Sequence, residues 1–178
     1  MVIMDEVNLN RNHELKNLAL SILKEVMDPE IPVISVLDLG IVRKIEPENT
    51  VEKNKLTVTI TPTYSGCPAL DRIRLDIYNS LISGGFDEVI IIEALSPAWT
   101  TDWISSEGAD KLKAYGIAPP TTVPVVCDLS LFQHEEAIQC PRCNSFNTAL
   151  ISRFGSTPCK ALYSCNDCKE PFDHFKCH

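Results

Sequence analysis

The sequence lacks the features that accompany export, membrane insertion and nonspecific nucleic-acid binding. Residues 1–12 contain Asp5 and Glu6 and have neither the basic start nor the apolar run of a secretory signal. No apolar run approaches the roughly 20 residues that cross a bilayer. The net charge is −8, whereas nonspecific binding to phosphates needs clustered Lys and Arg. We therefore expect a cytoplasmic protein that has neither a membrane nor a nucleic acid as a partner.

The chain also shows no internal repeat and no low-complexity block, and its 178 residues are enough for one ordinary domain with a small appendage. Charge and cysteine use change at the same place. Residues 1–138 hold 11 Lys/Arg against 21 Asp/Glu, whereas residues 139–178 hold five against three. We predict an α/β domain over residues 1–128, a linker over residues 129–138 and a zinc ribbon over residues 139–178.

The strongest motif lies in the basic tail. In a reducing compartment, eight cysteines are expected to be metal ligands or reactive thiols rather than disulfides. Two CxxC turns, separated by 21 residues, carry the four thiols Cys140, Cys143, Cys165 and Cys168. Two such turns complete a tetrahedral sulfur cage, which suits Zn²⁺ or a single iron. The spacing predicts one zinc per chain.

The residues between the two turns predict a β-hairpin, with strands at 145–154 and 160–163, and residues 172–175 after the second turn predict a third strand. A module of about 40 residues cannot usually build enough core alone, so we expect the metal to fold it. All four thiols would be used as ligands. Because a catalytic zinc keeps a position open for water, the predicted site is structural.

Several groups near the ribbon have no place in this cage. Cys159 is followed by Lys160, whose charge would favour a thiolate, so Cys159 is a working thiol, a relay ligand or a spare cysteine packed beneath the hairpin. Cys177 is expected to be inert. His174 and His178 receive no role from the sequence.

The remainder of the chain predicts an αββαβ arrangement with a mainly antiparallel or mixed sheet. A helix is expected over residues 13–27, after a frayed start, with a core face made of Leu15, Leu18, Ala19, Ile22, Leu23 and Val26. Strands at 41–45 and from residue 55 form an antiparallel hairpin. The apolar run 88–93 is expected to be a strand buried on both faces, in the middle of the sheet.

Later segments add less to this arrangement. A third helical stretch, capped by Thr100 or Thr101, is expected to run to Tyr115. Residues 123–127 predict a final edge strand, in which Cys127 is a core residue.

The central stretch of the sequence, residues 57–81, predicts a strand, a turn and a helix. Pro68 suits the first helical position, which places Cys67 at the N-cap. There the unpaired backbone N–H groups would favour the thiolate, the form that attacks electrophiles and binds metals. The alternative is a small, partly buried cysteine without chemistry.

The sequence Asp28-Pro29-Glu30 predicts a tight loop after the first helix. Its two carboxylates could supply hydrogen bonds or charge near a site. Equally, Asp28 could satisfy backbone N–H groups within the turn, and the local sequence favours this second interpretation.

These segments resemble a known family. The body resembles the iron–sulfur-assembly proteins related to SufT and the cytosolic iron–sulfur targeting factors, through Asp28-Pro29-Glu30, Leu37-Asp38-Leu39-Gly40, Thr61, Ser65-Gly66-Cys67-Pro68 and Ser96-Pro97-Ala98-Trp99. Together with the tail CPRCNS…FGSTPCKALYSCNDCKEPFDHFK, the whole chain resembles the PaaD family, which accompanies phenylacetyl-CoA epoxidase. The resemblance implies an α/β domain followed by a ribbon.

The resemblance also implies a function and a site. The protein would be an assembly factor rather than an enzyme, which helps to mature an iron–sulfur or di-iron centre of the oxygenase that epoxidises phenylacetyl-CoA. Its partners would be oxygenase or reductase clients of phenylacetate degradation and the iron–sulfur assembly machinery. On this view Asp28, Glu30, Thr61 and Cys67 converge on one site. Cys67, with Cys159 as a weaker candidate, would hold iron or a cluster transiently.

One thiolate cannot complete a four-thiolate cluster cage, so a homodimer, a client cysteine or a small thiol would supply the other ligands. Two other classes of function remain open. In the first, the ribbon is a protein-interaction scaffold within the oxygenase complex. In the second, it is a rubredoxin-like electron carrier, against which the absence of Gly after Cys143 and Cys168 weighs.

Overall fold

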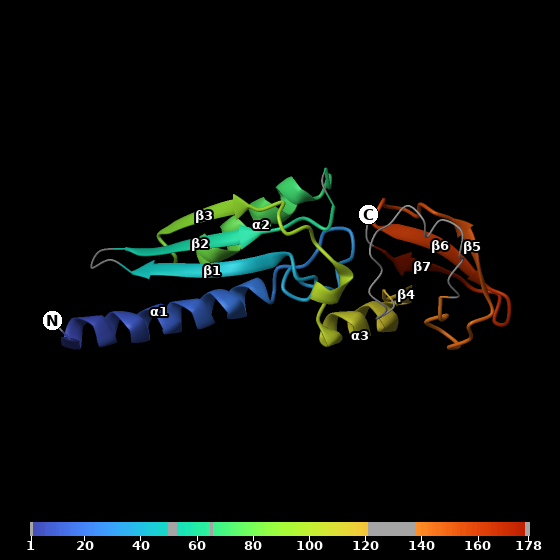
Figure 1. Cartoon of the computed structure of the whole chain (residues 1–178), viewed down its shortest axis with the longest axis horizontal. Helices are drawn as coiled ribbons and strands as arrows, with labels where there is room; N and C mark the ends of the chain where they lie inside the picture. Colours follow the sequence, from blue (N-terminus) through green and yellow to red (C-terminus); the bar gives the residue numbers. More distant parts are fainter. Residues whose placement is uncertain (1, 50–52, 65, 121–137, 177–178) are drawn as a thin grey trace. The chain divides into compact units, whose positions relative to one another are not determined.

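The computed structural model describes residues 2–49, 53–64, 66–120 and 138–176, with side chains in α1 and β1 described from residue 10 to residue 48 (Figure 1). The chain divides into two compact units, Met1–Ala98 and Trp99–His178, and each is considered by itself. No helix in the described part of the chain is long and apolar enough to cross a membrane.

The first unit is a mixed α/β fold, as the sequence predicts. Its elements are α1 (Val2–Leu23), β1 (Val42–Asn49), β2 (Asn54–Ile60), α2 (Leu70–Ser83) and β3 (Glu88–Glu93). The sheet has the order β1-β2-β3, in which β2 is antiparallel to β1 and parallel to β3. A parallel pair needs a crossover connection, and α2 provides it.

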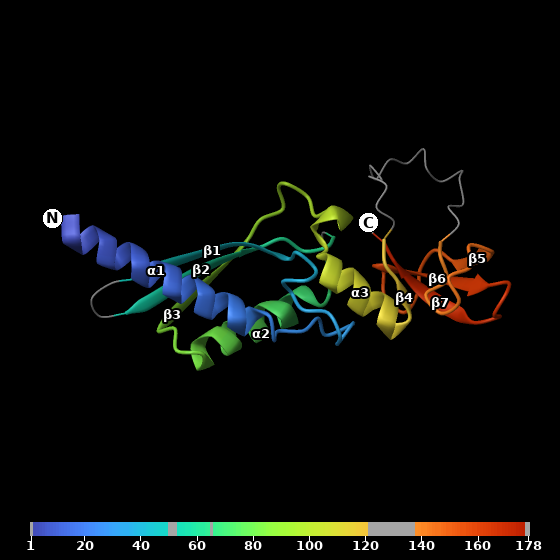
Figure 2. The same ribbon diagram turned by 90° about the horizontal axis from the view of Figure 1, so that it is seen from below.

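The two helices build the core of this unit on one face of the sheet (Figure 2). The predicted apolar stripe of α2 is buried at Ile73, Ile77 and Leu81. The predicted limits of the first helix were wrong, because α1 begins at Val2 and ends at Leu23. Leu18 was also misplaced, since it is exposed. The buried positions of α1 follow a four-residue spacing at Leu15, Ala19 and Leu23.

The prediction for residues 88–93 was wrong in its burial. The segment does form β3, but it lies at the edge of the sheet, and Ile90 and Ile92 are 48% and 47% exposed. Val89 is the only buried residue of this strand. Both helices cover the same sheet face, so alternate residues of β3 lack a packing layer.

The second unit contains a helical part and a ribbon. Its elements are η1 (Thr101–Trp103), α3 (Ser106–Tyr115), β4 (Ile117–Ala118), β5 (Thr148–Ser152), β6 (Lys160–Cys165) and β7 (Pro171–Phe175). The predicted hairpin and third strand are β5, β6 and β7, which pair with one another in antiparallel fashion. The short strand β4, which the sequence analysis missed, pairs in parallel with β7.

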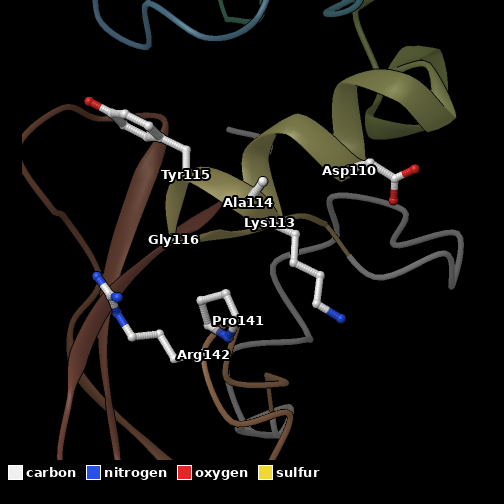
Figure 3. A pocket seen from close by; sticks show the side chains of 7 residues that line it. All are labelled: Asp110, Lys113, Ala114, Tyr115, Gly116, Pro141 and Arg142. Carbon is white, nitrogen blue, oxygen red and sulfur yellow. The ribbon is translucent and has the colours of Figure 1, made fainter.

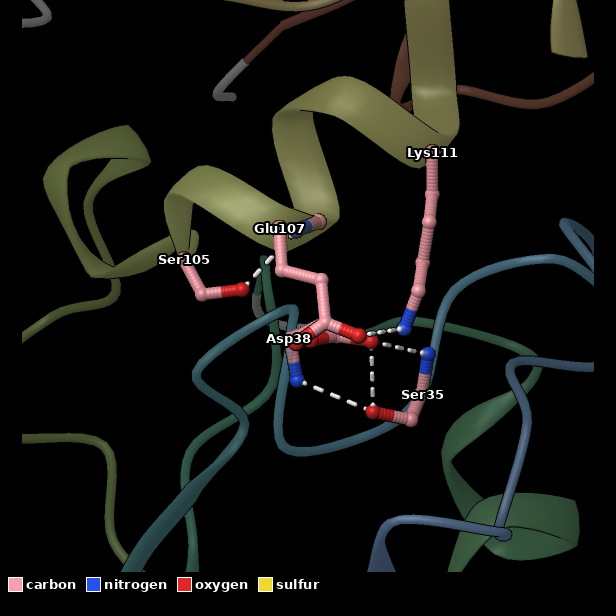
Figure 4. A network of polar contacts seen from close by, with 6 residues as sticks. Ser35, Asp38, Ser105, Glu107 and Lys111 are labelled. Carbon is pink, nitrogen blue, oxygen red and sulfur yellow. Dashed lines mark hydrogen bonds and ion pairs between the residues drawn. The ribbon is translucent and has the colours of Figure 1, made fainter. Parts of the chain in front are cut away.

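The N-cap of α3 also differs from the prediction. Ser105 Oγ accepts a hydrogen bond from the Gly108 N–H at 2.9 Å (Figure 4), whereas Thr100 precedes the short η1 and makes no side-chain cap bond. The helix ends at Gly116, which adopts a φ of 95° in the left-handed region that favours glycine.

The structure therefore groups residues 99–118 with the ribbon. Trp99 packs its ring edge-on against Phe175, with ring centroids 6.0 Å apart. The core of this unit contains Ala118, Ile138, Cys140, Cys165 and Phe172. The predicted boundary at residue 128, most of the predicted linker 129–138, and the predicted edge strand 123–127 with Cys127 lie outside the described residues.

Candidate functional site

The two CxxC turns bring four sulfurs to one point. The Sγ atoms of Cys140, Cys143, Cys165 and Cys168 all lie within 4.8 Å of one another. The Sγ atoms of Cys140 and Cys168 are 3.7 Å apart, and those of Cys143 and Cys165 are 3.5 Å apart. Sulfurs that each lie about 2.3 Å from a tetrahedral zinc ion are about 3.8 Å apart. The cluster therefore fits a four-coordinate metal with no open position.

The backbone shapes both turns in the same way. The Asn144 N–H donates to the Cys140 carbonyl at 2.9 Å, and the Lys169 N–H donates to the Cys165 carbonyl at 3.0 Å. Asn144 and Lys169 have φ values of 60° and 66°, in the left-handed region. These are the positions after the second cysteine of each turn, where glycine costs least. The chain forms both turns with non-glycine residues.

Polar side chains join the two turns. The Asp167 carboxylate accepts hydrogen bonds from Ser145 Oγ and from Asn147 Nδ2. These bonds lower the pKa of Asp167 from its usual value, so this carboxylate stays ionised at neutral pH. Asn166 adds a side-chain bond to Asn147 at 3.0 Å. The turns are thus held together by contacts outside the sulfur cluster as well.

Neighbouring groups shift the pKa values of three of the cluster thiols, Cys143, Cys165 and Cys168, in different directions. The backbone N–H of Cys168, helped by that of Asp167, lowers the pKa of Cys165 to about 7. At Cys143 the backbone hydrogen bond with Ser145 acts in the same direction. Desolvation and the neighbouring thiols outweigh it and raise the pKa of Cys143 to about 12. A bound metal would have to displace the thiol protons, so metal affinity decreases as the pH is lowered.

Cys67 lies in the loop between β2 and α2 and is half-buried. Its predicted place at the N-cap was wrong, because α2 begins at Leu70 and its N-cap is Ala69, without a side-chain cap bond. Pro68 and Ala69 form a turn ahead of the helix, in which the Cys67 carbonyl accepts from the Leu70 N–H at 3.2 Å. The argument for a thiolate from the helix N-terminus therefore no longer applies to Cys67.

The backbone next to Cys67 is open. Gly66 has a φ of 90° and is exposed, and a Cβ atom added there would meet no atom within 4 Å. The loop can therefore be approached from solvent at this point, although a larger residue would be strained by its φ.

The other predicted site residues have structural contacts of their own. Asp28 is buried, and its Oδ1 accepts the N–H groups of Glu30 and Ile31, each at 2.9 Å. This is the turn-stabilising role that the local sequence favours. Thr61 lies directly after β2 and is buried, and its N–H donates to the Ile41 carbonyl at 2.8 Å. Glu30 is exposed to solvent. Convergence of these residues with Cys67 remains a prediction.

A second buried carboxylate was not assigned a role from the sequence. Asp38 Oδ2 accepts from Ser35 Oγ at 2.8 Å, and the Asp38 N–H donates back to Ser35 Oγ at 3.1 Å (Figure 4). Both residues are buried. The reciprocal bonds stabilise the turn before Gly40, which has a φ of 67°. The spacing Ser-x-x-Asp, which resembles a capping box, is the signal that could have revealed this turn.

Cys159 is not part of the sulfur cluster. It is half-buried, and its Sγ lies 3.1 Å from Thr157 Oγ1. The Lys160 Nζ lies 3.7 Å from the Asp173 carboxylate, and both ends of this pair are largely shielded from solvent. The charge expected to favour a Cys159 thiolate is therefore shared with Asp173. Cys177 and His178 lie outside the described residues.

His174 is a structural group in the second unit. Its Nδ1 lies 3.2 Å from the Ala118 carbonyl, and its ring contacts the Tyr163 ring edge-on. Burial lowers the pKa of His174 from 6.5 to about 4. The ring is therefore neutral at pH 7 and donates Nδ1–H to the carbonyl, which fastens β7 to β4.

A pocket of about 510 Å³ lies in the second unit at the end of α3. Figure 3 shows Arg142 on one side of it and Lys113 on the other; its remaining lining residues are Asp110, Ala114, Tyr115, Gly116 and Pro141. The two cations suggest an anion, but the carboxyl end of a helix repels one. The pocket therefore does not identify a ligand.

Both units match families of known proteins. A family model described as "Iron-sulfur cluster assembly protein" matches residues 18–89, and one described as "PaaD zinc beta ribbon domain" matches residues 127–176. A solved domain of unknown function from Bacillus anthracis has a TM-score of 0.53 at 24% identity, covering 59% of this chain and 97% of its own. That likeness supports the fold of the first unit.

Two curated relatives extend the match. An "Fe-S protein maturation auxiliary factor" of Porphyromonas gingivalis (strain ATCC BAA-308 / W83) is 37% identical over 48% of this chain and 78% of its own length. A protein of Escherichia coli (strain K12), provisionally named as a subunit of 1,2-phenylacetyl-CoA epoxidase, is 43% identical over 88% of this chain and 90% of its own length. The chain therefore belongs to the PaaD family, with an iron–sulfur-assembly domain followed by a ribbon that carries a four-cysteine cluster.

Proposed function

We propose that this protein matures a metal centre of a phenylacetyl-CoA epoxidase system, by passing iron or an iron–sulfur cluster to an oxygenase or reductase client in the cytoplasm. The names of the two curated relatives support the two parts of this proposal, the epoxidase system and the maturation of iron–sulfur proteins. The single observation that carries it is the half-buried Cys67 in an open loop of the unit that matches iron–sulfur assembly proteins.

Cys67 is the only cysteine in residues 1–98, so this domain would offer iron a single thiolate ligand. A single thiolate gives a weak, incomplete set of ligands for iron, which suits transient holding and release of a cargo. The remaining ligands would come from a client cysteine, a second copy of the chain or a small thiol. Asp28, Glu30 and Thr61 would shape the approach to Cys67, with Asp28 acting through the loop that its carboxylate holds together.

The ribbon would have a separate, structural task. The sulfur separations of 3.7 Å and 3.5 Å suit zinc, which supplies folding energy and no redox chemistry. Cys140, Cys143, Cys165 and Cys168 would all be ligands, so the chain offers the metal no free position for water or substrate. We expect one zinc per chain.

The proposal is tested by anaerobic incubation of the purified chain with ferrous iron, sulfide and a small thiol. We expect the wild-type chain to retain iron and labile sulfide after desalting, whereas Cys67→Ala loses most of both. Cys159→Ala is the matched control, because Cys159 is a second half-buried thiol outside the cluster. Equal retention by Cys67→Ala and the wild type would show that Cys67 does not hold the cargo.

The scaffold function is the second candidate. It is favoured by exposed apolar side chains along the ribbon, among them Phe146 and Phe154. An electron carrier is less well supported, because it requires iron in the four-cysteine cluster. Metal analysis of protein purified without added metal separates these possibilities, since an iron-loaded ribbon would be red.

A further inference from the structure

The ribbon exposes large apolar side chains along one strand. Phe146, Ile151 and Phe154 lie before, within and after β5 and are 60%, 55% and 61% exposed. With the neighbouring cations Arg153 and Lys176, we call this set the β5 surface. Ile151 and Phe154 are only three residues apart in the sequence, and exposed apolar groups that lie close together commonly mark an interaction site.

The β5 surface is held in place rather than loose. The Lys176 Nζ lies 4.6 Å from the centre of the Phe154 ring. The Phe154 N–H donates to Ser152 Oγ at 3.3 Å, and Ser152 Oγ donates to the Phe154 carbonyl at 2.8 Å. At the other end, the Asn147 N–H donates to Ser145 Oγ at 3.0 Å. A preorganised surface loses less entropy when it binds a partner.

The position of β5 indicates how a partner would be contacted. In the sheet order β4-β7-β6-β5, β5 is an edge strand. The pairing of β5 with β6 shifts register between Leu150 and Ser152, which makes Ile151 the extra residue of a bulge. Bulges at sheet edges hinder the addition of another strand and redirect side chains. We therefore expect contact through the side chains and not through a continued sheet.

The charges select the partner. Arg153 and Lys176 lie at the Phe154 end, and residues 139–178 hold five Lys/Arg against three Asp/Glu in an otherwise acidic protein. Complementary charge steers association and excludes wrong partners. The chemistry that fits is a polypeptide segment with apolar side chains and an acidic group at one end.

A single-stranded nucleic acid would also offer flat apolar groups and negative charge. Two observations disfavour it. Lys176 already lies over one side of the Phe154 ring, where a base would stack. At the other end, Ser145 and Asn147 on either side of Phe146 donate hydrogen bonds to the Asp167 carboxylate, whose oxygens would repel a phosphate.

We propose that the β5 surface is a docking site for an acidic, partly apolar polypeptide segment of a partner protein. Ile151 and Phe154 supply the apolar contact, and Arg153 and Lys176 supply the charge. This inference does not depend on the role proposed for Cys67.

The test uses the full, zinc-loaded chain to select binders from a displayed library of random peptides. We expect the selected peptides to share apolar residues together with Asp or Glu. The best peptide should bind Ile151→Asp and Arg153→Glu at least about tenfold more weakly than the wild type. The loss in Arg153→Glu should shrink at high salt. The matched control is Ile92→Asp, a similarly exposed isoleucine in β3, which should bind normally.

Several results would overturn the proposal. These are the absence of selected peptides, selected peptides without an acidic bias, or equal binding by Ile151→Asp when its metal content is normal. Tight binding of an all-thymine oligonucleotide that Phe154→Ala abolishes would assign the surface to nucleic acid. Self-association in sedimentation that Ile151→Asp abolishes would assign it to a second copy of the chain.

Discussion

The two units of the molecule are held together by different means. In the unit Met1–Ala98, the core consists of apolar side chains from two helices packed on a sheet, with Ile77, Leu81 and Val58 fully buried. In the unit Trp99–His178, Cys140 and Cys165 are themselves members of the core. We therefore expect the first unit to fold by burial of apolar surface alone and the second to depend on a metal at its centre.

This difference separates the two kinds of cysteine. The thiols of the ribbon form one closed cluster, so they are unsuited to reactions with other molecules. Cys67 belongs to a unit whose buried core does not include it, so in the proposed function this thiol would bind and release a cargo without unfolding its surroundings. We infer that the two units have different tasks: the first would bind the iron or cluster cargo transiently at Cys67, and the second would bind the partner protein through the β5 surface.

The largest effect is expected from Cys143→Ser, which removes one metal ligand. We expect the metal to be lost and the whole second unit to lose its protection from hydrogen exchange, while β2 and α2 stay protected. Zinc analysis and hydrogen exchange with mass spectrometry measure both. Cys159→Ser is the control and should keep its metal. A second unit that stays protected in Cys143→Ser would mean that the metal does not hold it together.

The reverse experiment damages the apolar core of the first unit. Ile77→Ala leaves a cavity beneath α2, where Ile77 is fully buried, and should lower the free energy of unfolding of that unit by about 2–5 kcal/mol. Urea unfolding followed by hydrogen exchange measures it. The exposed Leu75→Ala on the same helix should change little. Release of the metal of the second unit by Ile77→Ala would contradict the claim that the two units are stabilised independently.

A smaller effect concerns pH and His174. Because its pKa of about 4 in the folded state lies below 6.5, the unfolded chain binds more protons between these values. Its contribution to stability is complete above pH 6.5 and is lost as the pH falls toward 4. Between about pH 7.5 and about pH 5, wild type should lose about 2 kcal/mol more unfolding free energy than His174→Asn.

Tryptophan fluorescence in urea measures the free energy of unfolding of the second unit, because Trp99 and Trp103 both belong to that unit. Thiol protonation destabilises both proteins alike, so the difference between them isolates His174. An identical pH dependence in the two proteins would show that His174 is not neutralised by folding.

The smallest effect is expected at the start of α3. Ser105→Ala removes the acceptor for the Gly108 N–H and should lower the free energy of unfolding of the second unit by about 1 kcal/mol. Ser106→Ala, at the first helical residue, is the control and should be nearly neutral. Tryptophan fluorescence in urea measures both. A larger loss in Ser106→Ala would reverse the assignment of the cap.

The features that were predictable from the sequence are those set by local spacing. Two CxxC turns must direct their sulfurs inward, and the stripe Ile73, Ile77 and Leu81 follows from the helical period. The N-cap of α2 was missed because a proline and an alanine can form a turn as readily as a first helical turn. Residue type alone does not choose between these two conformations.

Other features depend on contacts between distant parts of the chain. The run of isoleucines in β3 is apolar enough for a central strand, and only the placement of both helices on one face leaves Ile90 and Ile92 exposed. Likewise, Ala118 pairs with His174, far along the chain, and nothing near Ala118 indicates that partner. Periodicity describes one segment at a time and cannot specify such pairings.

The most direct test of the proposed maturation role examines the client. The reductase and oxygenase components of the epoxidase would be purified from cells that carry wild-type protein or Cys67→Ala, and their iron and labile sulfide measured. We predict that Cys67→Ala yields a client deficient in iron or sulfide, although the variant itself keeps its zinc and its fold. Full iron and sulfide occupancy of the client in the Cys67→Ala cells would contradict the account.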